Sequence, residues 1–107
     1  MTQPTYANLF GTGATFNTGT NKLEIPIAAL AESGLDATEP TALEALGAII
    51  KNSHSWLSAN TDEAVMANSS LNIFAPTTRN SLPKTQFAYS VNFYGSYASP
   101  TFDPDEV

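Results

Sequence analysis

The single histidine of the chain, His54, is the first residue to examine, because an imidazole can act as a base or a metal ligand near neutral pH. It lies in a segment of helical periodicity, with Ile50 and Leu57 about one turn away on either side. Ser53 and Ser55 are its sequence neighbours, but successive side chains diverge on a helix, so neither forms a local Ser–His pair. No carboxylate lies within a turn to orient the ring. We therefore interpret His54 as a boundary residue that closes the core.

Trp56, the only tryptophan, lies on the same segment, so His54 and Trp56 are the two residues we expect to line a pocket between helix and sheet. Asp62 and Glu63 could approach His54 from the turn that follows. A carboxylate within hydrogen-bonding reach of the imidazole, beside a cavity, would favour an enzyme. A His54 without such a carboxylate would count against an enzyme.

Two other motifs resemble known binding loops but lack the residues or the spacing that those loops require. Gly11-Thr12-Gly13 lacks the third glycine of a dinucleotide-binding loop, since Phe16 occupies that position, and a turn and strand follow it instead of a helix. Asp103, Asp105 and Glu106 surround a proline near the end of the chain, a spacing that does not match a calcium-binding loop. We therefore predict no catalytic residue, no metal site and no cofactor.

Composition narrows the classes of partner. The formal charge is −6, with four basic against ten acidic residues, and nucleic-acid or anionic-membrane binding requires clustered Lys and Arg. We expect neither partner. No apolar run approaches the roughly 20 residues that cross a bilayer. There is no cysteine and no secretory signal pattern, so the expectation is a soluble, cytoplasmic protein.

The strongest structural signal is an amphipathic helix between Pro40 and Asn60, which begins between residues 37 and 42. Thr41 and Glu44 have the spacing of a capping box at its start. The apolar stripe comprises Ala42, Leu43, Leu46, Ile49, Ile50, Ser53, Trp56 and Leu57. This stripe is predicted to be the core, with Leu46, Ile50 and Leu57 almost fully buried.

Short strands and turns are predicted elsewhere. Strands are expected at Leu9–Phe16, Lys22–Ile27, Leu71–Ala75 and Thr85–Tyr94, of which the last has the clearest alternation. A hairpin loop is expected at Asn17–Asn21, a helical turn at Ala28–Ser33, a second short helix from Asn60 through Ala67, and a long polar connection at Pro76–Lys84.

These elements predict an α+β fold in a single domain, residues 1–107, with loose termini at 1–5 and 99–107. The order strand, strand, helix, strand, strand would form two hairpins in a small antiparallel sheet, with the main helix packed on one face. Leu, Ile, Val and Phe make up about a fifth of the chain, so the core is thin, and a partner subunit often completes such a core.

Alternation along Thr85–Tyr94 gives the predicted sheet a second face away from the helix. Ser90, Asn92 and Tyr94 lie on that face, and Tyr97 follows them. A mixed polar and aromatic surface is typical of interfaces, so we predict an interaction surface here and a two-fold homodimer, with another protein as a possible partner.

Three functions remain open from the sequence. The first is a small non-catalytic protein-interaction or structural module that self-associates. The second is a small-ligand-binding or enzymatic domain with its pocket near His54. The third, a phage or particle structural component, depends only on the high proportion of Ser, Thr and Asn, which make up almost a third of the chain.

Overall fold

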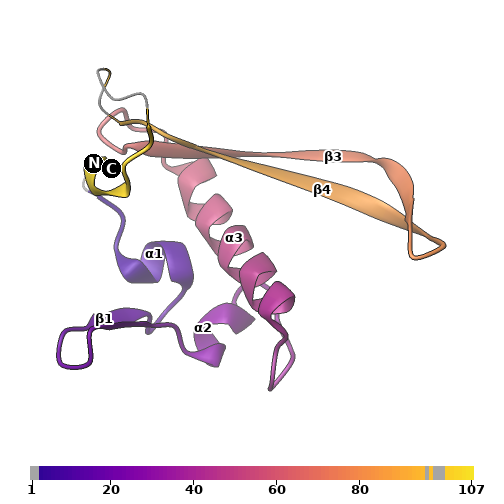
Figure 1. The fold of residues 1–107 in the computed structure, drawn as a ribbon, viewed down its shortest axis with the longest axis horizontal. Helices are drawn as coiled ribbons and strands as arrows, with labels where there is room; N and C mark the ends of the chain where they lie inside the picture. The colour runs from indigo at the N-terminus through magenta and orange to yellow at the C-terminus, as the bar shows by residue number, and fades with distance from the viewer. Residues whose placement is uncertain (1–2, 96, 98–100) are drawn as a thin grey trace.

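The computed structural model describes residues 3–95, 97 and 101–107, and its fold is α+β as predicted (Figure 1). Its helices and strands are α1 (Tyr6–Phe10), β1 (Thr15–Asn17), β2 (Lys22–Glu24), α2 (Ile27–Ala31), α3 (Ala42–Ala59), β3 (Ala67–Arg79) and β4 (Leu82–Phe93), followed by the short 3-10 helix η1 (Pro104–Glu106). The order of two strands, a main helix and two strands confirms the predicted order of elements, although the hairpins form two sheets instead of the one predicted.

The two hairpins do not share a sheet. β1 pairs with β2 and β3 pairs with β4, each antiparallel, and the two pairs form separate two-stranded sheets. β1 and β2 are only three residues long, and the Asn17 side chain accepts hydrogen bonds from Gly19 and Thr20 in the predicted hairpin loop. Figure 1 places this small hairpin beside α1 and α2, while β3 and β4 lie on the other side of α3.

The main helix α3 begins as its capping box predicts. The Thr41 hydroxyl accepts from the Glu44 backbone N–H at 3.1 Å, and the Glu44 carboxylate accepts from the Thr41 N–H at 2.9 Å. The helix ends at Ala59, where the Asn60 side chain donates to the Trp56 carbonyl at 2.8 Å. Asn60 is thus used to close α3. The second short helix predicted from Asn60 is therefore wrong, and a turn leads directly into β3.

The N-terminal part of the predicted strand Leu9–Phe16 is also wrong, because α1 occupies it. Thr5 and Asn8 form a capping box in which an amide takes the place of the usual Glu or Gln. Gly11 ends this helix with φ +102°, and a Cβ there would lie 2.4 Å from the Ala29 carbonyl oxygen. Only glycine allows α1 and α2 to approach so closely.

α3 holds the two short helices through side-chain hydrogen bonds to their backbone. The Ser53 hydroxyl donates to the Leu9 carbonyl at 3.0 Å, and the Asn52 amide donates to the Ala29 carbonyl at 3.4 Å. These contacts satisfy carbonyl groups in α1 and α2 that a helix as short as five residues leaves without an internal partner.

β3 and β4 form one long hairpin, residues 67–93, which we call the arm. The polar connection predicted at Pro76–Lys84 is wrong, since pairing continues to Arg79 and Leu82 and only Asn80 and Ser81 form the turn. Both turn residues have positive φ, +52° and +61°, as a tight two-residue hairpin turn requires. The register shifts between Phe74 and Thr77, around Pro76, which cannot donate to the ladder.

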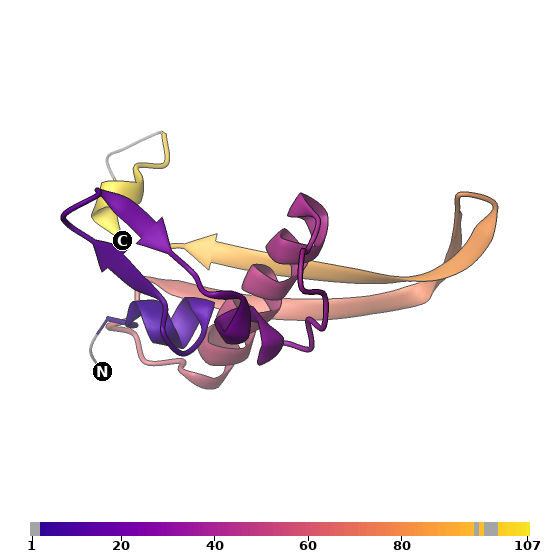
Figure 2. The ribbon, with the colours of Figure 1, turned by 90° about the horizontal axis from the view of Figure 1, so that it is seen from below.

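The arm extends away from the rest of the chain. Figures 1 and 2 show it leaving α3 and continuing well past the other elements. The radius of gyration is 15.9 Å, against about 13 Å for a compact chain of this length. The accessible surface is 7693 Å², about 1,900 Å² more than a compact monomer of this mass exposes.

The buried core is small, and part of the predicted helix core is wrong. Leu57 is 4% exposed, but Ile50 is only half-buried and Leu46 is 50% exposed. The reason is the position of the crossing, because the arm meets α3 near the C-terminal half of the helix and diverges from the first half (Figure 1). The other buried apolar residues are Ala14, Ala29, Leu30, Ala48 and Val65.

The ends of the described chain make some contacts. The Phe102 ring stacks on Phe93 with centroids 5.0 Å apart. The predicted looseness of residues 1–5 and 99–107 concerns motion in solution and stays a prediction, and residues 1, 2, 99 and 100 lie outside those the structure describes.

The burial of α3 leads to a stability test. Leu57→Ala should lower the free energy of unfolding by about 2–5 kcal/mol, because it removes buried methyl groups and leaves a cavity. Leu43→Ala, at an exposed position of the same helix, should cost less than about 1 kcal/mol. Denaturant melts at concentrations where the chain is monomeric measure both. Equal losses would mean that α3 packs differently.

Candidate functional site

His54 has a partner that the sequence did not indicate. Its Nδ1 lies 2.8 Å from the Ser69 hydroxyl oxygen, and its ring meets Tyr89 edge-on with centroids 5.2 Å apart. Ser69 is on β3 and Tyr89 on β4, so His54 joins α3 to both strands of the arm. Ser69 could not have been found from local spacing, because it lies 15 residues away and only the fold brings it near.

A serine beside a histidine is the starting geometry for nucleophilic catalysis, so the surroundings of this pair matter. The described partners of the His54 ring are a hydroxyl and an aromatic edge, and neither is the carboxylate that orients the base in a triad. Among the residues that the structure describes, no three His, Cys, Asp or Glu side chains are grouped to hold a metal ion. The pair has the character of a polar contact between α3 and the arm.

Trp56, the second predicted pocket residue, lies on a different side of α3. It lines a shallow polar pocket of about 320 Å³ together with Glu32 and Asn52, next to α1. The structure therefore does not bring His54 and Trp56 together. This follows from helix geometry. Trp56 comes two residues after His54 on α3, so its side chain points about 200° away from the direction of the arm.

Three acidic residues outside the arm are engaged in local hydrogen bonds. Hydrogen bonds from the side chain and backbone of Thr12 lower the pKa of Glu32, and those from the backbone and side chain of Thr41 lower the pKa of Glu44. The Ala64 N–H likewise lowers the pKa of Asp62. Each carboxylate stays ionised near neutral pH and stabilises a turn or a helix start.

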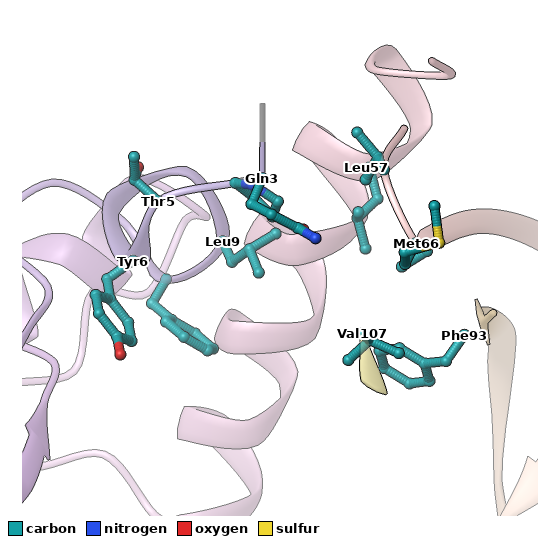
Figure 3. A pocket seen from close by; sticks show the side chains of 12 residues that line it. Gln3, Thr5, Tyr6, Leu9, Leu57, Met66, Phe93 and Val107 are labelled. Atoms are coloured by element: carbon teal, nitrogen blue, oxygen red, sulfur yellow. The ribbon is translucent and has the colours of Figure 1, made fainter. Parts of the chain in front are cut away.

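An open apolar groove of about 600 Å³ lies at the base of the arm. Figure 3 shows Leu9 on one side of it and Phe93 and Val107 on the other, with Leu57 and Met66 between them. None of its lining residues is Asp, Glu, His, Lys or Arg. The groove can therefore accommodate an apolar group. Sequence reasoning missed it, because α1 was expected to be part of a strand.

One face of the arm carries exposed apolar side chains and is only partly covered. Ser69 and Tyr89 on this face meet α3. Side chains alternate along a strand, so Ile73 and Phe87, which are paired across the hairpin, lie on the same face further out. They are 63% and 58% exposed. No described element covers them.

The opposite face carries most of the interaction surface predicted from the sequence. Asn68 donates to the Tyr94 hydroxyl at 2.5 Å, and Asn92 donates to Asn68 at 2.9 Å. Ser90 lies one step further along this face, paired with Ser70, and both are exposed. Asn92 and Tyr94 are thus connected through Asn68, which the sequence did not single out.

Tyr97 is fully exposed, and no described contact places it against this network. Whether this face binds a partner stays a prediction.

Comparison with protein-family models, with curated proteins and with solved structures found no match to this chain. Within the described residues, no helix has the length and apolar character needed to span a membrane.

The His54–Ser69 contact can be tested through stability. Ser69→Ala should lower the free energy of unfolding by about 0.5–1.5 kcal/mol, because it leaves the half-buried imidazole nitrogen without its partner. Ser70→Ala, at the next position on the opposite, exposed face, should change it by less than about 0.5 kcal/mol. Urea unfolding of both variants measures the difference. A neutral Ser69→Ala would show that the contact does not hold the arm.

Proposed function

We propose that this protein is a small, non-catalytic structural module that self-associates through its arm, residues 67–93. The observation that supports this most is the amount of exposed surface. The chain exposes about 1,900 Å² beyond a compact monomer of its mass, whereas one partner in a standard protein–protein interface contributes about 800 Å².

The exposed apolar side chains indicate where association would be most favourable. Ile73 and Phe87 project from a two-stranded sheet, and such a hairpin is only marginally stable in water without a covering layer. Burying apolar surface is the dominant favourable term in association. A second chain laid on the arm would supply the missing layer.

A two-fold homodimer is the assembly we propose, because closed two-fold pairs are the commonest symmetric oligomers. The small core supports it, since association compensates for limited burial within one chain.

We also propose a cytoplasmic location, which the absence of cysteine supports because disulfides are rare in reducing compartments. A component of a larger particle is a special case of the same function.

The second candidate function is binding of a small apolar ligand. The groove at the base of the arm supports it, because its volume of about 600 Å³ is within the usual range for ligand pockets and its walls are apolar. This groove is separate from His54, so it favours a binding domain over an enzyme. Saturable binding of an apolar ligand by the monomer, lost on Leu9→Lys, would support this second function.

Light scattering tests self-association directly. The wild-type chain should scatter with about twice its monomer mass of 11.4 kDa at micromolar concentration. Phe87→Lys should shift the mass toward the monomer, because it places a charge on the exposed apolar face of the arm. Tyr94→Lys tests the opposite face in the same way, and the larger shift identifies the face in contact. A wild-type chain that stays monomeric at high concentration would contradict the proposal.

A further inference from the structure

α3 presents a second uncovered strip on its side toward the arm. His54 marks that side, because it contacts Ser69 and Tyr89. Positions 50, 47 and 43 lie on the same side at helical spacing, progressively further from the crossing. Leu43 is 77% exposed, and a Cβ added at Gly47 would meet no atom within 4 Å. The arm has diverged from the first half of α3 here, and the space beside position 47 continues into a shallow hollow that Ser33, Gly34 and Leu35 also line.

The arm contributes the facing strip. Ile73 and Phe87 lie beyond the crossing on the face that meets α3 at Ser69. Figure 1 shows the arm and the first half of α3 spreading apart from their crossing. We call the region between these two strips the notch, and we define it by Leu43, Gly47, Ile73 and Phe87.

Charge is divided between the two limbs. The arm contains Arg79 and Lys84 and no acidic residue, which gives it a formal charge of +2. The rest of the chain carries all ten acidic residues and has a formal charge of −8. Asp36 and Glu39 belong to the exposed segment just before α3, next to the strip that carries Leu43. The arm is thus basic overall and the segment that leads into α3 is acidic, and opposite net charges favour association.

We propose that the notch is the docking site for the arm of a second copy of this chain. In a two-fold pair, each arm would lie on the first half of the partner's α3, with Ile73 and Phe87 against the strip at Leu43 and Gly47. Arg79 and Lys84 would then lie near the acidic residues at the start of that helix. This inference rests on the proposed self-association and specifies its surface.

Three observations favour a second copy over an unrelated occupant. One chain carries both complementary surfaces, so a two-fold pair satisfies each of them twice. The excess exposed area, about 1,900 Å², is enough for such a reciprocal contact. Gly47 lies inside a helix, where glycine is unfavourable, and no contact within the chain requires it there. Close packing of a partner strand gives that glycine a physical reason.

Gly47→Leu separates docking from folding. Since the space at position 47 is open within one chain, the leucine should leave the stability of the monomer unchanged or raise it through better helix propensity. In the dimer it should block the partner arm and weaken association at least tenfold by sedimentation equilibrium. Ser55→Leu, at an exposed position on another side of α3, is the matched control and should not change association.

A charge exchange tests which surfaces meet. The double variant Arg79→Glu with Lys84→Glu, and the double variant Asp36→Lys with Glu39→Lys, should each associate about tenfold more weakly than the wild type, with the effect reduced at high salt. Mixed together, the two variants should form a heterodimer, because both arm-to-helix contacts again join opposite charges. Direct contact between two arms would leave the second variant unaffected.

The outcomes distinguish this inference from the proposed function. A wild-type dimer unaffected by Gly47→Leu, with no preferential pairing of the two charge variants, would overturn docking in the notch and leave self-association standing. A monomeric wild type would overturn both. Loss of association with Gly47→Leu but not with Ser55→Leu, together with the mixed heterodimer, would support the notch as the interface.

Discussion

The crossing of α3 with the arm is the contact on which the rest of the structure depends. At this point His54 holds Ser69 and Tyr89, so a single residue joins the helix to both strands. α3 also binds α1 and α2 through Ser53 and Asn52. It therefore connects the arm to α1 and α2, and its position decides which apolar side chains are covered.

The crossing lies near one end of both elements, and this explains the shape of the molecule. Near it, Leu57 and Val65 are buried, while at the far ends Leu43 and Ile73 are exposed. A two-stranded hairpin has no further strand to shield it, so exposure continues to the tip. The same offset produces the large radius of gyration and the two facing apolar strips. The proposed self-association would cover both strips with chain that one copy does not have.

Some patterns that act over a few residues were read correctly from the sequence, whereas the short helix from Asn60 and the connection at Pro76–Lys84 were wrong. The capping box at Thr41 and Glu44, the loop after Asn17 and the alternation before Tyr94 all depend on neighbours in sequence, and each one is found in the structure. Burial was harder to predict, because an apolar stripe on a helix does not indicate how much of its length another element covers. Leu46 matches the stripe as well as Leu57 does, yet only Leu57 lies at the crossing. The Ser69 contact and the groove depend on long-range packing, which local spacing cannot reveal.

Several polar residues of this chain have structural uses, and this bears on function. Thr5, Thr41 and Asn60 close helix ends, and Asn68 joins Asn92 to Tyr94 on one face of the arm. The imidazole, which is the side chain best suited to acid–base work, has a hydroxyl partner at the crossing. The surface that these contacts leave available is apolar, extended and divided in charge. Such a surface can be stabilised by a complementary chain, and this is the physical basis for proposing a second copy of the chain as the partner.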